Sequence, residues 1–264
     1  MKKSIISAKN ISFPRNNILN NYRIPNKSIL IYGLHACKSA LQNTEREKVL
    51  ILTNKKNYEF WKKQALDYNL KVRVVTVEER DLDLISNKNV HQNVILIAKP
   101  LRKLKLIDYL KNNNSDQQKV ILLDQVSDPQ NIGSIIRSAF AFGFNAVGLL
   151  KNKSPFETST IIKASSGEIE KITLIELGNL INEINLLKSK GFFTFGLANE
   201  GQRNIKNISI NEKKIALIIG SEGKGLRSLT KKNLDEIFYI PIDKNCNSLN
   251  ASNAAAIAMY QLGT

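Results

Sequence analysis

Ile218-Ile-Gly-Ser-Glu-Gly-Lys-Gly-Leu226 is the stretch that decides the fold of this 264-residue chain. The apolar run Ile215–Ile219 leads into it and predicts a buried strand, after which three glycines follow within six residues. Glycine allows positive φ and lets the backbone approach a ligand closely. Glu222 stands in the middle of this glycine loop, residues 220–225, at the edge of a sheet where ligand sites gather. Taken alone, the loop fits a strand-to-helix turn with a solvated glutamate equally well.

Apolar runs and helical stretches alternate on both sides of the glycine loop and predict an α/β domain over residues 119–264. Asp128 and Pro129 suit the start of a helix, as cap and first residue, and this helix is expected to reach about Phe142. The other expected elements are strands at Val120–Leu123, Ala146–Leu150, Phe192–Phe195 and Ile215–Ile219, and an alanine-rich helix at Leu249–Leu262.

A second, smaller α/β domain is predicted at residues 30–99. Short apolar runs begin at Lys48, Val72 and Asn93, and the segment 55–68 between the first two has a helical pattern. We expect residues 100–118 to form a linker with a short helix, and residues 1–29 a basic, flexible arm.

The formal net charge of +16 favours a polyanionic partner such as RNA. Residues 1–100 hold 18 basic and 8 acidic residues, whereas residues 101–264 hold 21 and 15. Part of the excess can reflect a lysine-rich composition, yet its concentration in the first part points to that part for RNA capture. Two unpaired cysteines, no long apolar run and no metal-ligand spacing lead us to expect a cytoplasmic protein with no membrane span and no metal.

Polar residues on two predicted helices are further candidates. Asn131 lies in the first turn of the helix after Asp128, and Arg137 lies six residues later among apolar neighbours. A guanidinium there needs a partner, either a structural carboxylate or a phosphate or oxyanion. Ser248 and Asn250 stand at the start of the last expected helix, as caps or as ligand-binding residues.

Several common chemistries lack their sequence patterns. No strand is followed by G-x-G-x-x-G, and the glycine loop does not match the G-x-x-x-x-G-K-[ST] spacing of nucleotide hydrolases. His35 and His91 are the only histidines, and both lie in the first domain. A dinucleotide-binding enzyme, a nucleoside triphosphatase and a serine hydrolase are therefore disfavoured.

Three stretches, in this order, resemble the motifs of the SpoU/TrmH family of RNA ribose 2′-O-methyltransferases. They are Asp128-Pro-Gln-Asn-Ile-Gly-Ser-Ile-Ile-Arg137, Ile219–Gly225, and Ile240-Pro-Ile with Ser248-Leu-Asn250 and the helix after it. The resemblance implies a SPOUT α/β-knot domain, in which a parallel sheet carries a C-terminal trefoil knot. It also implies a homodimer with the active site at the interface, and S-adenosylmethionine as cofactor without a metal. The implied cofactor-binding residues are Gly220, Ile240 and Leu249, with Gly196 and Leu197 lining the same pocket.

The first domain resembles the L30e-like substrate-binding domain of the RlmB type, which modifies guanosine in 23S rRNA. Tyr32-Gly-Leu-His-Ala36 and Val90-His-Gln92 carry this likeness, so Tyr32, His35 and His91 are the implied RNA-binding residues. A lone histidine is more often structural than functional, and that alternative stays open. Guanosine in tRNA is the alternative substrate, and a non-catalytic RNA-binding protein is the alternative class.

The resemblance assigns the chemistry to Arg137, Asn131, Glu222, Ser248 and Asn250. Because arginine does not deprotonate in proteins, we expect Arg137 to bind phosphate and stabilise the developing alkoxide rather than act as the base. Asn131 is expected to orient the hydroxyl or Arg137, and Glu222 to fix Arg137 or the RNA. Ser248 and Asn250 are expected to place the ribose.

Overall fold

The computed structural model describes residues 19, 24–208 and 212–263, which form two compact units divided in the sequence between Leu101 and Arg102. The expected arm at residues 1–29 falls largely outside the described residues. Leu19, however, is buried in the hydrophobic core of the first unit with Tyr32 and Leu52. Part of the arm is therefore anchored by apolar contacts.

The first unit is the expected small α/β domain, built on a four-stranded sheet of order β1-β4-β2-β3. Strand β4 runs antiparallel to both β1 and β2, while β3 is parallel to β2. The helix expected at 55–68 begins after a short 3-10 turn at Lys55–Asn57. The elements are β1 (Ile29–Tyr32), α2 (Leu34–Gln42), β2 (Lys48–Thr53), α3 (Tyr58–Asp67), β3 (Arg73–Thr76), α4 (Glu79–Ile85) and β4 (Val94–Ala98).

The second unit is built on a seven-stranded sheet of order β7-β6-β5-β10-β8-β11-β9, and every pairing in it is parallel. This confirms the predicted parallel α/β class; the trefoil knot stays a prediction. The strands are β5 (Gln118–Asp124), β6 (Ala146–Leu150), β7 (Thr173–Leu177), β8 (Phe193–Leu197), β9 (Arg203–Asn204), β10 (Lys214–Gly220) and β11 (Glu236–Tyr239). The helices are α5 (Leu106–Asn112), α6 (Pro129–Ala141), α7 (Ser159–Ala164), α8 (Leu180–Ser189), α9 (Ser228–Asn233) and α10 (Ala251–Gly263), with 3-10 turns at Glu168–Lys171 and Ile205–Asn207.

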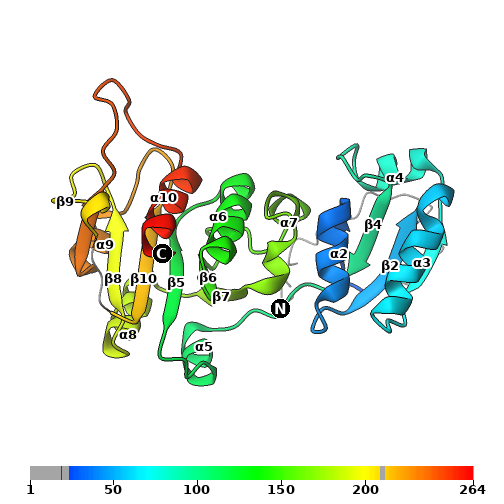
Figure 1. Ribbon diagram of the computed structural model, residues 1–264, viewed down its shortest axis with the longest axis horizontal. Helices are drawn as coiled ribbons and strands as arrows, with labels where there is room; N and C mark the ends of the chain where they lie inside the picture. The colour runs from blue at the N-terminus through cyan, green and yellow to red at the C-terminus, as the bar shows by residue number, and fades with distance from the viewer. Residues whose placement is uncertain (1–18, 20–23, 209–211, 264) are drawn as a thin grey trace, which may run out of the picture. The chain divides into compact units, whose positions relative to one another are not determined.

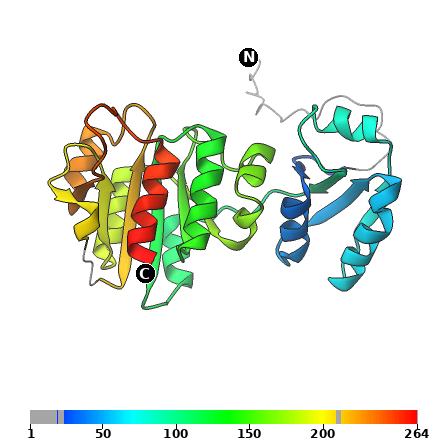
Figure 2. The same ribbon diagram turned by 45° about the horizontal axis from the view of Figure 1, so that its top comes forward.

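Two pairs of helices cover this sheet. Residues of α5 and α8 share a hydrophobic core with the strands, and α6 and α10 lie side by side on the opposite face (Figures 1 and 2). Ala251, Ala255 and Ala258 of α10 are buried, because their small side chains permit close packing.

The expected linker at residues 100–118 is mostly part of the second unit. Leu104 forms a bridge with Ile175 at the edge of the sheet, with backbone hydrogen bonds to Leu174 and Glu176. Leu106 and Tyr109 are buried in the core, and this burial raises the pKa of the Tyr109 hydroxyl. The short helix expected in this segment is α5, and burial of Leu106 and Tyr109 attaches it to the sheet.

Candidate functional site

A cavity of about 280 Å³ opens at the carboxyl ends of β8 and β10. Four of the five residues expected to bind the cofactor line it, namely Leu197, Gly220, Ile240 and Leu249. Glu222 and Ser248 line it as well. The rest of the lining is Ala198, Asn199, Glu200, Ile219, Ser221, Gly223, Lys224, Gly225, Leu226, Lys231, Ile242, Ala251 and Ala254.

Gly220 is required by the way the glycine loop folds back on the end of β10. A Cβ atom at this position would lie 2.1 Å from the carbonyl carbon of Gly225 and 2.3 Å from the amide nitrogen of Leu226. Both are backbone atoms, so no side-chain rotation relieves the clash. Only glycine lets the loop close and leave its backbone groups facing the cavity.

Gly196 lies behind the cavity wall instead of lining it. A Cβ atom there would meet the side chain of Leu226 at 2.5 Å and that of Leu234 at 2.9 Å. The residue therefore allows Leu226, which does line the cavity, to pack against β8.

Asn131, Glu222 and Asn250 meet in one hydrogen-bonded cluster, although they come from three distant segments. The Asn131 amide donates from Nδ2 to Oε2 of Glu222 at 3.1 Å. The Asn250 amide donates from its own Nδ2 to Oδ1 of Asn131 at 2.9 Å. Asn131 is 5% exposed, and it thus holds an accessible carboxylate at the mouth of the cavity.

The neighbouring strands and the helix caps bring these segments together. In the parallel pairing of β5 with β10, Asp124 lies opposite Gly220, so the loops that follow the two strands leave the sheet at the same edge. Asp128 caps α6 by accepting from the amides of Gln130 and Asn131 at 3.1 and 3.3 Å. Asn250 caps α10 by accepting from the Ser252 amide at 2.8 Å. The helix-cap role that its sequence position suggested is therefore confirmed, and its ligand-binding role stays a prediction.

Arg137 lies apart from the Asn131–Glu222–Asn250 cluster. It is exposed, and no hydrogen bond or ion pair joins its guanidinium to another described residue. The structural ion pair, one of the two alternatives for this guanidinium, is thus not formed in the described part of the chain. Six residues along an α-helix turn the side chain by about 240°, so Asn131 and Arg137 of one helix cannot converge on one point.

A buried carboxylate at the end of β5, which the sequence reasoning missed, fixes the far end of the glycine loop. Asp124 is 0% exposed and accepts from Nε of Arg227 at 2.7 Å and from the Thr230 hydroxyl at 2.7 Å. It also accepts from the Arg227 amide at 3.2 Å. An aspartate at the end of a buried strand was the available signal, because a buried charge must be paired.

A second missed pair lies in the cavity wall, where the Lys231 ammonium donates to Glu200. This hydrogen bond holds the pKa of the Glu200 carboxyl below its usual value. The pair supplies one charge of each sign beside a cavity whose remaining lining is mostly apolar or backbone.

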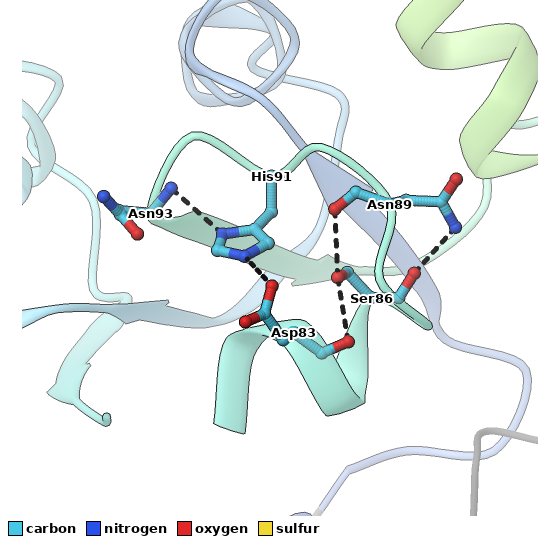
Figure 3. Close-up of polar contacts among 5 residues, drawn as sticks. All are labelled: Asp83, Ser86, Asn89, His91 and Asn93. Atoms are coloured by element: carbon cyan, nitrogen blue, oxygen red, sulfur yellow. Dashed lines mark hydrogen bonds and ion pairs between the residues drawn. The ribbon is translucent and has the colours of Figure 1, made fainter. Parts of the chain in front are cut away.

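The three candidates in the first domain differ in accessibility. Tyr32 is 5% exposed and belongs to the hydrophobic core, whereas His35 is exposed at the start of α2. His91 is 6% exposed, and both of its ring nitrogens are engaged (Figure 3). Its Nε2 lies 3.0 Å from Oδ1 of Asp83, and its Nδ1 accepts from the Asn93 amide at 3.0 Å.

The lining of the cavity fits an adenosine-containing cofactor. Apolar residues such as Ile240 and Leu249 form its walls, and the glycine loop beside Gly220 lines it with backbone. Within the described residues, no group of three or more histidine, cysteine, aspartate or glutamate side chains is placed to hold a metal ion. None of the helices in the described part of the chain is long and apolar enough to cross a membrane.

Comparisons with known proteins agree with this geometry. Residues 118–260 match the SpoU rRNA Methylase family, and residues 30–104 match the RNA 2′-O ribose methyltransferase substrate binding family. A protein described as a TrmH family tRNA/rRNA methyltransferase from Staphylococcus aureus is 34% identical, over 88% of this chain and 94% of its own. The 23S rRNA (guanosine-2′-O-)-methyltransferase RlmB of Blochmanniella floridana is 29% identical, over 89% of this chain and 94% of its own.

Solved structures share the fold. The SpoU methyltransferase AviRb from Streptomyces viridochromogenes, in complex with AdoMet, superposes with a TM-score of 0.78 at 18% identity, over 94% of this chain and 97% of its own. An AdoMet-bound rRNA methyltransferase from Sinorhizobium meliloti gives 0.75 at 22% identity, over 89% and 86%. With a family match over more than half of its length, this chain belongs to the SpoU rRNA methylase family of RNA 2′-O-ribose methyltransferases.

Proposed function

We propose that this protein transfers a methyl group from S-adenosylmethionine to the ribose 2′-hydroxyl of a guanosine in 23S rRNA. The observation that carries the proposal is the Asn131–Glu222–Asn250 cluster at the mouth of the cavity. The names of the RlmB relative and of the substrate-binding family support the choice of RNA substrate.

We assign cofactor binding, hydrogen bonding to the RNA and placement of the ribose to different residues around the cavity. Backbone at Gly220, Ile240 and Leu249, with Leu197, would hold the cofactor, which supplies an electrophilic methyl group when bound. Glu222, oriented by Asn131, would accept a hydrogen bond from the RNA or from Arg137, and Ser248 and Asn250 would place the ribose. With the cofactor bound, the ribose oxygen would take up the methyl group, the cofactor sulfur would be the leaving group as a neutral thioether, and the hydroxyl proton would pass to solvent. Holding the two reactants in register lowers the barrier by up to about 7–11 kcal/mol in ideal systems.

Arg137, which lies apart from the cluster of its own chain, would be supplied to the active site by a second subunit. It lies on the outer side of α6 with Phe140, which is 39% exposed. Ile257 and Tyr260 of the adjacent helix α10 are 36% and 56% exposed, and the Tyr260 ring packs edge-on against Phe142 at 5.9 Å. An exposed apolar face of this kind suits a self-complementary dimer interface. In such a homodimer, Arg137 of one subunit would bind phosphate and stabilise the developing alkoxide beside the cluster of the other.

In this proposal the protein acts in the cytoplasm, and its catalytic domain carries the trefoil knot implied by its family. Guanosine in tRNA is the second candidate substrate, because the relative from Staphylococcus aureus is described for both RNA classes.

The decisive experiment supplies labelled S-adenosylmethionine with separate pools of unmodified 23S rRNA and tRNA, followed by mapping of the labelled nucleotide. We expect label on one guanosine ribose in 23S rRNA. Label in tRNA alone would move the substrate assignment, and cofactor binding without transfer to either pool would contradict the proposed function.

A further inference from the structure

The loop Asn87–Asn93 of the first domain, called here the α4–β4 loop, has an unusual backbone. Asn87, Lys88, Gln92 and Asn93 all have positive φ, between 52° and 61°. Asparagine tolerates this region, but lysine and glutamine rarely adopt it. Such conformations persist only where surrounding contacts enforce them, and they gather at functional sites.

Two sets of contacts hold the two ends of the loop. At its start, the Ser86 hydroxyl lies within hydrogen-bonding distance of the carbonyl oxygens of Asp83 and Asn89, at 3.2 and 3.1 Å. The Asn89 side chain returns a bond to the Ser86 carbonyl at 2.7 Å. At its end, buried His91 joins the Asp83 carboxylate to the Asn93 amide (Figure 3). With both ring nitrogens occupied in this way, His91 shapes the loop from within.

A third contact ties the loop to the start of α2. Oε1 of Gln92 accepts from the Leu34 amide at 2.8 Å. Gly33, just before Leu34, has φ of 98°, a backbone conformation that L side chains rarely adopt, so the turn into α2 favours glycine. The exposed residue His35 follows Leu34 in α2, so its backbone lies beside the loop.

The braced loop presents exposed groups that have no bracing role. The Val90 residue is 65% exposed, and Lys88 is exposed. A cation and an apolar tip beside an imidazole suit RNA, because phosphates bind lysine and unstacked bases pack against flat or apolar side chains. This surface lies within the region that matches the substrate-binding family.

We propose that the α4–β4 loop is an RNA-contacting surface, with Lys88 on a phosphate and Val90 against a nucleobase. In this proposal, which rests on the proposed function, His91 and Gln92 are positioning residues that set the loop and do not touch RNA.

Two substitutions test the contact and the brace separately. Lys88→Asn removes the charge while supplying a residue that tolerates positive φ. Its matched control is Lys27→Asn, at an exposed lysine with φ of 66° that precedes β1. Pairing of Ile29 with Ala98 and of Tyr32 with Ile95 places Lys27 at the opposite end of the sheet from the loop. Gln92→Ala removes the brace, and Gln42→Ala is its control, because the exposed Gln42 amide bonds to the Tyr68 hydroxyl at 2.8 Å elsewhere in the same domain.

The measurements are the Kd for 23S rRNA and tRNA transcripts against salt, the KM for RNA, kcat, cofactor binding and thermal unfolding. Lys88→Asn should weaken RNA binding about two- to tenfold and reduce the salt slope by about 0.7–0.9. Gln92→Ala should raise the KM for RNA by a similar factor, with kcat, cofactor affinity and unfolding temperature unchanged, and both controls should match the wild type.

The results that overturn the loop proposal differ from those that overturn the proposed function. RNA binding of Lys88→Asn and Gln92→Ala equal to that of the controls would sink the loop proposal alone. A fall in unfolding temperature and in kcat with Gln92→Ala would make the brace merely structural and also overturn it. A wild-type protein that binds RNA without transferring methyl groups would contradict the proposed function, while the binding comparison would still decide the role of the loop.

Discussion

At certain positions a single residue determines the shape of the cavity, because the backbone atoms that surround it cannot rotate away. Gly220 is the strongest case, with Gly225 and Leu226 both closer than 2.5 Å to where a Cβ atom would lie. We expect Gly220→Ala to displace the glycine loop and abolish cofactor binding, measured by calorimetric titration with S-adenosylmethionine. Gly178→Ala is the matched control, since the nearest atom to its added Cβ is 3.8 Å away. Equal affinity of the two variants would contradict this role of the loop.

The Arg137 side chain is exposed, which fits a role in catalysis better than a role in stabilising the fold. Because its guanidinium has no partner among the described residues, Arg137→Ala should leave the unfolding temperature and cofactor affinity unchanged. Methyl transfer should fall by at least about a hundredfold, as for the loss of one oxyanion-stabilising donor. Near-normal turnover in a single-turnover assay with labelled cofactor would defeat the assignment.

Elements of the second unit are joined by polar contacts as well as by apolar packing. Asp235 precedes β11, accepts from the Thr194 amide and hydroxyl of β8, each at 2.8 Å, and pairs with Lys188 of α8 at 2.7 Å. Burial raises the pKa of Asp235, but the bonds from Lys188 and Thr194 outweigh it and leave this pKa below the usual 3.8.

This depressed pKa predicts a stability change in acid. The folded state holds the Asp235 proton less tightly than the unfolded state, so the stabilisation is present above about pH 4 and is lost as pH falls through the folded pKa. Urea unfolding between pH 6 and pH 3 should show a shallower loss of stability for Asp235→Asn than for the wild type. Parallel curves would show that Asp235 contributes nothing to the acid sensitivity.

At the scale of the whole molecule, the proposed enzyme is active only as a dimer, because Asn131 and Arg137 point in different directions from one helix. Subunits carrying Arg137→Ala and subunits carrying Glu222→Ala should each be inactive. After mixing and subunit exchange, half of the dimers are mixed, and each of these holds one intact site out of two. We therefore expect recovery of about a quarter of the wild-type rate.

The same mixture separates the two possible arrangements of the site. Where Arg137 and Glu222 of the same chain share a site, no mixed dimer has an intact one, and activity stays absent. Light scattering on the wild-type protein provides the control for dimer formation.

The sequence alone determined the strands at 120–123, 146–150 and 215–219, the helix after Asp128, and three motifs specific enough to identify the family. These features depend on neighbours in the chain, through apolar runs, caps and glycines, so they can be read from order alone. The sequence reasoning did not detect β7 or β11, or the packing of Leu106 and Tyr109, because their burial depends on partners elsewhere in the sheet.

Only the tertiary structure decided which candidates meet. The parallel register of β5 with β10 brings Asn131 to Glu222, and the position of Asn250 at the cap of α10 brings it to Asn131. The turn of α6 keeps Arg137 apart, and the fold of the first domain buries His91 between Asp83 and Asn93. Such convergence depends on strand order and helix rotation, which relate residues about a hundred positions apart and leave no trace in local sequence.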